Sequence, residues 1–190
     1  DRQQIIKNNL DYTFFSWSVQ GQVSPIPVTK AEGIYFWDAD GKRYIDFSSQ
    51  LMNTNIGHQH PKVVKAIQDQ AAQVCFVHPG NTTEVRALLG KKLAEVTPGN
   101  LKKTFFALGG AEANENAIKI ARFYTGRHKI LARYRSYHGA THGSIALTGD
   151  YRRRDSTRKV RIDPLYNDRT TILYYYPGMH PDLVDSLVAN

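Results

Sequence analysis

The sequence has very little cysteine and no long apolar run. Cys75 is the single cysteine, which excludes an internal disulfide, and its position between Val74 and Phe76 predicts a small buried side chain rather than a nucleophile. No apolar run approaches the roughly 20 residues of a membrane helix, and the first residues, DRQQIIKNN, lack the apolar segment of a signal peptide. We therefore expect a soluble, cytoplasmic protein with no membrane partner.

Several common site motifs are absent as well. The chain contains neither the GxGxxG of dinucleotide sites nor the GK[ST] of a P-loop. His58 and His60 have no carboxylate or cysteine at ligand spacing, and His138 and His142 lack the glutamate of HExxH, so we predict no metal site. The net charge of +8 raises the question of whether the protein binds nucleic acid. No nucleic-acid-binding motif occurs with the basic segment 152–161, which predicts a solvated loop instead.

What the chain does have is enough apolar sequence for a core, with 41% hydrophobic residues in 190. Residues 1–50 predict an N-terminal lobe, because IYFWDADGKRYIDF is typical of a β-hairpin that turns at Asp38–Gly41. Residues 51–190 predict an α/β domain. Two helices there, one from Pro61 and one capped by Thr82 or Thr83, carry apolar stripes that we expect to be buried: Val63, Val64, Ile67, Ala71 and Val74 in the first, and Val85, Leu88, Leu89, Leu93 and Val96 in the second.

The stretch from Lys102 to Gly126 organises this second part. Thr104–Leu108 predicts a buried strand, Gly109-Gly110 a turn, and the following residues an amphipathic helix that Gly126 ends. Lys129–Tyr134 predicts a second strand, so the three elements would form a βαβ unit with parallel strands and a right-handed crossover. Beyond it we expect a short helix at 140–148, irregular chain at 150–178 and a last helix at 182–188.

The glycine turn predicts an anion site. The first amides of a helix have no intrahelical acceptor and lie at the positive end of the helix dipole, and two glycines let a phosphate approach the N–H groups of Gly110 and Ala111. The alternative is a packing turn without a ligand, in which Glu112 and Glu115 satisfy the dipole locally.

Tyr137 follows the second predicted strand, in the sequence Ser136-Tyr137-His138-Gly139. Ligands of open α/β sheets gather at the carboxyl ends of strands, so Tyr137 and the glycine turn would face one pocket. An aromatic side chain beside a phosphate cradle suits a flat, phosphorylated ring. The alternative is that Tyr137 is a packed core aromatic.

Four blocks, in this order, resemble the N-terminal part of the class III (omega) aminotransferases of pyridoxal-phosphate fold type I: GIYFWDADGKRYIDF, NIGHQHPKVVKAI, GGAEANENAIKIAR and SYHGATHGSIALTGD. The resemblance covers residues 14 to 150 and is weak from 151 to 190. It implies an incomplete large domain, with helices on both faces of a mostly parallel sheet, and the cofactor pyridoxal 5'-phosphate. It also implies a homodimer or larger homo-oligomer, to which the segment Phe76–Pro79 would contribute.

The resemblance also assigns residues. The cofactor phosphate would lie on the amides of Gly110 and Ala111, and the cofactor ring on Tyr137, whose motif His138 and Gly139 complete. The substrate pocket would be bordered by Trp17, Leu51 and Met52. Leu51 stands where the family often has an aromatic residue, which leaves the substrate preference open.

The implied reaction moves an amino group from a primary amine or omega-amino acid to a 2-oxo acid such as pyruvate, and SSQLMNTNIGH and SWS most resemble the taurine-pyruvate type. The family's cofactor-linked lysine and the aspartate beside the pyridine nitrogen belong to later motifs that this sequence lacks. We therefore expect an N-terminal portion of a longer enzyme that is inactive alone and contributes no catalytic residue. The alternatives are another enzyme of the same scaffold, an aminomutase or a decarboxylating transaminase, or a non-catalytic dimerisation or binding fragment.

Overall fold

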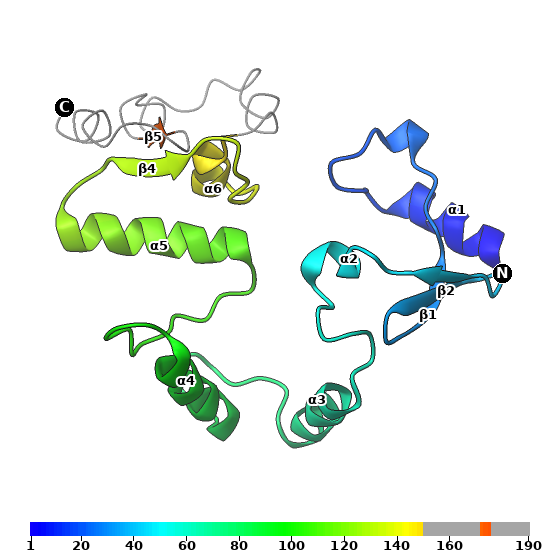
Figure 1. Ribbon diagram of the computed structural model, residues 1–190, viewed down its shortest axis with the longest axis horizontal. Coiled ribbons are helices and arrows are strands. Elements are labelled where there is room, and N and C mark those ends of the chain that lie inside the picture. The colour runs from blue at the N-terminus through cyan, green and yellow to red at the C-terminus, as the bar shows by residue number, and fades with distance from the viewer. Residues whose placement is uncertain (150–171, 176–190) are drawn as a thin grey trace. The chain divides into compact units, whose positions relative to one another are not determined.

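The computed structural model of the protein describes residues 1–149 and the backbone of 172–175. The chain divides into two compact units, Asp1–Thr83 and Glu84–Asn190, which are described separately (Figure 1). The boundary that we predict at residue 50, between an N-terminal lobe and a larger domain, stays a prediction. None of the helices in the described ranges combines the length and apolar composition that a bilayer crossing requires.

The first unit is built on a small antiparallel sheet. Helix α1 (Arg2–Tyr12) and the 3-10 turn η1 (Gln20–Gln22) precede strands β1 (Val28–Glu32), β2 (Tyr35–Asp38) and β3 (Arg43–Ile45), which pair in the order β1-β2-β3. The predicted hairpin is confirmed, with β2 and β3 as its two strands. Gly41 takes φ +79° in its turn, a left-handed conformation that glycine adopts without strain.

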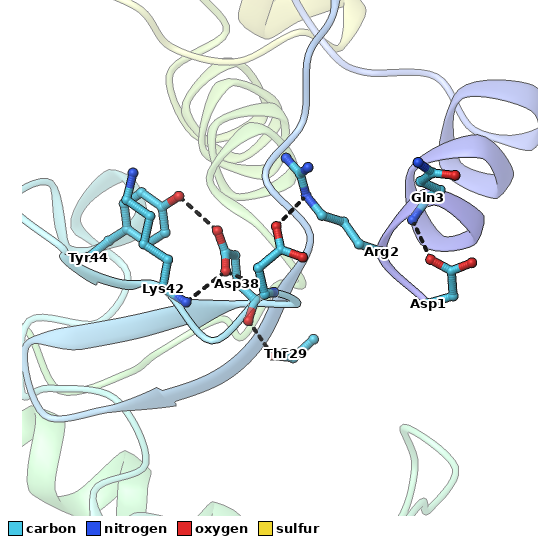
Figure 2. A network of polar contacts seen from close by, with 8 residues as sticks. Asp1, Arg2, Gln3, Thr29, Asp38, Lys42 and Tyr44 are labelled. Carbon is cyan, nitrogen blue, oxygen red and sulfur yellow. Dashed lines mark hydrogen bonds and ion pairs between the residues drawn. The ribbon is translucent and has the colours of Figure 1, made fainter.

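Asp38 holds this hairpin turn together (Figure 2). Its Oδ1 accepts hydrogen bonds from the amides of Asp40 at 3.0 Å and Lys42 at 2.9 Å, and its Oδ2 accepts one from the Tyr44 hydroxyl at 2.8 Å. Burial opposes ionisation of Asp38, but these hydrogen bonds outweigh it and keep the pKa of the carboxyl below its ordinary value. The turn is therefore fixed by side chains as well as by the strand ladder, and the Arg2 Nε lies 3.2 Å from Asp40 Oδ2 beside it.

The rest of the first unit contains α2 (Ser49–Met52) and α3 (Pro61–Gln73). Pro61 opens α3 as predicted, since a proline needs no hydrogen-bond acceptor at the first helical position. The loop between the two helices is attached to the sheet region through His58, which exchanges two backbone hydrogen bonds with Gly33, at 3.0 and 2.8 Å. The His58 Nε2 also lies 2.8 Å from Asp46 Oδ2.

The second unit contains α4 (Glu84–Val96), α5 (Gly110–Thr125), β4 (Ile130–Arg133), α6 (His142–Leu147) and β5 (Ile172–Tyr175). Strands β4 and β5 are parallel, with Ile130 opposite Ile172. Helix α6 contacts both α5 and β4 (Figure 1). In the described part of this unit, the buried apolar side chains are those of Ala132, Ile145 and Leu147, so its core lies where α6 meets β4.

The predicted strand at Thr104–Leu108 is wrong. The structure gives this segment no regular structure, and Phe105 is 65% exposed. Parallel β4 pairs instead with β5, within a region that we expected to be irregular. An apolar run favours a strand only where a neighbour completes its hydrogen-bond ladder, and within the described ranges no strand pairs with 104–108. The predicted βαβ unit of 104–108 and 129–134 is therefore wrong, and the parallel pair in the structure is β4 with β5.

The predicted helices that correspond to α4, α5 and α6 are confirmed, and Gly126 ends α5 with φ +67° as expected. The predicted burial of the apolar stripes of α3 and α4 is wrong, since Ile67 and Leu88 are both more than half exposed. Amphipathicity determines which face of a helix favours burial, but burial also needs a facing surface. Cys75 is exposed too, and its Sγ donates to the carbonyl of Ala71 at 3.3 Å. The predicted helix at 182–188 and the basic segment 152–161 lie outside the described residues.

Candidate functional site

The N-terminus of α5 offers free backbone amides. Its N-cap is Gly109, in extended conformation with φ −163° and ψ 168° and without a side-chain cap. The first backbone hydrogen bond of the helix runs from the Ala113 amide to the Gly109 carbonyl, at 3.0 Å. The amides of Gly110 and Ala111 precede it and have no acceptor within the helix, so they point out of its positive end.

Open space lies in front of this turn. A Cβ built on Gly109 or on Gly110 would meet no atom within 4 Å. The acidic side chain that we considered as a local partner, Glu112, accepts instead from the amide of Leu108 at 2.8 Å, one residue before the N-cap. Glu112 therefore remains close to the dipole, while the approach to Gly110 is clear for an anion.

The segment 137–139 lies against the same turn. Gly139 has φ +136°, and a Cβ at this position would lie 2.6 Å from the Ala111 Cβ and 2.7 Å from the Ser144 Cβ. Only glycine allows so close an approach in this conformation. The Asn114 side chain of α5 also donates to the His138 carbonyl, at 2.6 Å. The structure therefore brings together four of the predicted cofactor residues, Gly110 and Ala111 with His138 and Gly139.

Tyr137, the fifth of them, is 45% exposed. The alternative that it is a packed core aromatic is therefore not what the structure shows, since nearly half of the residue is open to solvent. His138 is more enclosed, because its Nε2 is buried and has no hydrogen-bond partner among the described residues. A buried ring nitrogen without a partner is uncommon in folded proteins and is compatible with a partner that binds later.

Two residues that the sequence reasoning missed fix this arrangement. Ser144 and Thr148 are fully buried, both at 0% exposure, on and just after α6. The Ser144 hydroxyl donates to the Ala111 carbonyl at 2.9 Å, and the Thr148 Oγ1 accepts from the His138 amide at 3.0 Å. The signal in the sequence was two hydroxyl residues four apart among apolar ones in SIALTG, which is the spacing of one face of a helix.

Glu115 also fixes this arrangement, in a role that the sequence reasoning did not predict. We considered it as a partner of the α5 dipole, but its Oε1 accepts from the Thr141 hydroxyl at 2.6 Å and from the amides of Gly143 and Ser144 at 2.7 and 3.0 Å. Burial opposes the ionisation of Glu115, yet these hydrogen bonds prevail and lower the pKa of the carboxyl. It therefore caps α6 rather than α5.

The predicted substrate residues Trp17, Leu51 and Met52 belong to the first unit, and all three are more than half exposed. They share positive φ angles, of 54°, 56° and 64° respectively. A left-handed conformation costs a residue with a Cβ roughly 1–2 kcal/mol. Strain of this kind occurs preferentially where function requires it.

The histidine pairs are arranged differently from a metal site. Within the described ranges no group of three histidine, cysteine or carboxylate side chains could hold a metal ion. His142 begins α6, whereas His138 precedes the helix, so they do not form an i, i+4 pair on one helix. His58 does have a carboxylate beside it, that of Asp46, which the sequence spacing did not reveal.

Comparison with known proteins now adds to this geometry. The family model for class III aminotransferases matches residues 17–167. The chain belongs to the class III aminotransferase family. Members of this family use pyridoxal 5'-phosphate, and the fold is α/β as predicted, since its solved neighbours are transaminases and the structure combines helices and strands.

Among the curated relatives, a leucine/methionine racemase of Thermococcus litoralis is 43% identical over 66% of this chain and 29% of its own length. A 5-aminovalerate aminotransferase of Pseudomonas aeruginosa is 39% identical over 68% of this chain and 31% of its own. The chain of this class III aminotransferase therefore spans about 30% of the length of these curated relatives.

Among solved structures, the taurine:2-oxoglutarate aminotransferase of Bifidobacterium kashiwanohense, in complex with PLP and glutamate, has a TM-score of 0.83 and 38% identity, and the match covers 97% of this chain and 39% of that one. An (S)-enantioselective omega-transaminase of Thermomicrobium roseum also has a TM-score of 0.83, with 30% identity over 93% of this chain and 40% of that one.

Proposed function

We propose that this chain supplies the phosphate- and ring-binding part of the pyridoxal 5'-phosphate site of an aminotransferase. The observation that carries the proposal is the first turn of α5, where free amides face open space and the segment 137–139 lies directly against Ala111. The residues present fit the cofactor. Its phosphate needs backbone amides that do not already donate to another acceptor, and the amides of Gly110 and Ala111 have no acceptor within the helix.

Each residue has a role in binding. The amides of Gly110 and Ala111 hold the phosphate, and the positive end of α5 favours its charge. The partly exposed ring of Tyr137 lies against the cofactor ring, and His138 and Gly139 hold the backbone that carries it. When bound, the cofactor supplies an electron sink that stabilises the negative charge left when the substrate loses a proton.

The intact enzyme would transfer an amino group from a primary amine or omega-amino acid to a 2-oxo acid such as pyruvate. Support comes from the relatives, which include a taurine and a 5-aminovalerate aminotransferase. Trp17, Leu51 and Met52 would border the substrate. A second candidate is another reaction of the same cofactor on this scaffold, which the similarity to a leucine/methionine racemase favours.

We further propose a cytoplasmic homodimer, to which the exposed segment at Phe76 contributes. The 190 residues alone would not catalyse transfer, because the cofactor lysine belongs to a motif that they do not contain.

The test uses the full-length protein and its visible absorption band with pyridoxal 5'-phosphate. In Gly110→Asp a carboxylate and a Cβ occupy the place of the phosphate, so we expect the band to be lost after dialysis. Gly90→Asp in α4 is the matched control, since a Cβ at Gly90 also meets no atom within 4 Å. Wild-type occupancy in Gly110→Asp would refute the phosphate assignment.

Activity assays then separate the two candidate reactions. The protein is incubated with taurine or 5-aminovalerate and pyruvate, and alanine formation is measured. L-leucine alone is the substrate for the racemase reaction, which chiral chromatography detects. Racemisation without any alanine formation would favour the second candidate.

A further inference from the structure

Glu115 connects two segments that are distant in sequence. It lies in the second turn of α5, and the three groups that donate to its Oε1 are 26, 28 and 29 residues further along the chain. Two of them, the amides of Gly143 and Ser144, belong to the first turn of α6 and have no acceptor within that short helix. The Glu115 carboxylate therefore accepts the hydrogen bonds that these two amides cannot make within α6.

Gly143 makes room for this carboxylate. A Cβ at position 143 would overlap the Glu115 Oε2 and would lie 3.0 Å from Cδ and 3.1 Å from Oε1. The overlap with Oε2 is closer than a carbon and an oxygen atom can approach, so any larger residue at 143 has to move the carboxylate. The two residues are thus matched in shape as well as in hydrogen bonding.

From α6 the connection continues to the cofactor residues. Ser144, whose amide binds Glu115, donates through its hydroxyl to the Ala111 carbonyl at 2.9 Å. Thr148, one residue beyond α6, accepts from the His138 amide at 3.0 Å and donates to the Ser144 carbonyl at 3.0 Å. Because Ser144 and Thr148 are fully buried, a shift of α6 would break these bonds without replacement by water.

We propose that Glu115 is a positioning residue of the cofactor site: its carboxylate fixes α6 on α5, and α6 in turn holds Tyr137–Gly139 against the amides of Gly110 and Ala111. This inference rests on the proposed function of that turn. Glu115 itself does not touch the cofactor. A site that is already rigid before the ligand binds has a higher affinity for it, because less conformational entropy is lost on binding.

The experiment measures the dissociation constant of pyridoxal 5'-phosphate for the full-length apoprotein, by equilibrium dialysis, together with the thermal midpoint of the apoprotein. We expect Glu115→Ala to raise the dissociation constant at least tenfold, because three donors lose their acceptor. Glu115→Gln keeps an oxygen for the three donors and should stay within about threefold of wild type. Glu95→Gln is the control, since Glu95 forms an exposed ion pair with Lys92 in α4.

A second variant displaces the Glu115 carboxylate without removing it. Gly143→Ala leaves Glu115 in place but displaces its carboxylate, so the dissociation constant should also rise at least tenfold. In the Glu115→Ala background the obstructing side chain is gone, and Gly143→Ala should then add less than about twofold. If Glu115→Ala folds poorly, the single variant Gly143→Ala still tests whether the position of the carboxylate controls cofactor affinity.

The outcomes are distinguishable. If the wild-type protein binds no pyridoxal 5'-phosphate, the proposed function itself fails. If wild type binds and Glu115→Ala binds equally well, the positioning role is overturned while the proposed function stands. If Glu115→Ala and Gly143→Ala lower the thermal midpoint of the apoprotein but leave the dissociation constant unchanged, or if their effects simply multiply, Glu115 is merely structural.

Discussion

Replacing Gly139 by alanine tests the close approach on which the site depends. The residue has φ +136°, a region that residues with a Cβ rarely adopt, and holding alanine there costs about 1–3 kcal/mol. The new methyl group would also lie 2.6 Å from the Ala111 Cβ, 2.7 Å from the Ser144 Cβ and 2.9 Å from the Ala111 Cα. These are packed or backbone atoms that cannot swing aside, so the overlap adds a further cost of about 1–3 kcal/mol.

The sum, about 2–6 kcal/mol, is a large part of the 5–15 kcal/mol that stabilises a typical domain. It would be relieved in part by moving the segment 137–139 away from α5. We therefore expect Gly139→Ala in the full-length apoprotein to lower the thermal midpoint by at least about 4 °C. We also expect it to weaken pyridoxal 5'-phosphate binding at least tenfold, since Tyr137 would move with the segment.

The matched control is Gly109→Ala at the other side of the same site. Gly109 has an extended φ of −163°, which any residue adopts, and its Cβ would meet no atom within 4 Å. We expect this variant to stay within about 1 kcal/mol of wild type. A thermal midpoint of Gly139→Ala equal to that of Gly109→Ala would refute the argument from close approach.

Two further predictions concern single side chains. Tyr137→Ala should weaken cofactor retention during dialysis about tenfold, because the contact between its ring and the cofactor ring is lost. The apoprotein should keep its thermal midpoint, because Tyr137 is 45% exposed. Unchanged retention would remove Tyr137 from the site. At Asp46, burial favours the neutral form, but hydrogen bonds from His58 and Gln50 outweigh it and lower the pKa of the carboxyl below its ordinary 3.8. A lowered folded-state pKa means that the stabilisation is present above the unfolded-state pKa and is lost as the pH falls through the folded one. Asp46→Asn should therefore be less stable than wild type in urea at neutral pH, and the difference should shrink below about pH 4; a constant difference down to pH 2 would contradict this.

The sequence alone predicted those elements whose signals are local. The hairpin of β2 and β3, the proline start of α3, the glycine turn before α5 and its end at Gly126 all depend on φ preferences and hydrogen bonds among neighbouring residues. Gly110, Ala111 and Tyr137 were proposed from the same kind of local signal, a glycine turn at a helix start and an aromatic residue after a predicted strand, whereas His138 and Gly139 were assigned by the family resemblance.

Long-range pairing was not predictable in this way. An apolar run such as 104–108 and the amphipathic helices α3 and α4 carry a tendency to pair or to be buried, but the partner surface is set by the fold. Strand β5 could not be recognised as the partner of β4, because parallel pairing leaves no turn between the strands to mark it.

The sequence by itself therefore determined which backbone amides at the start of α5 have no acceptor within the helix, because helix termini and glycine conformations are local properties. Only the tertiary structure decided that Gly139 touches Ala111 and that Glu115 caps a helix nearly thirty residues away. Such contacts arise from hydrogen bonds and close packing between distant segments, and no spacing along the chain encodes their geometry.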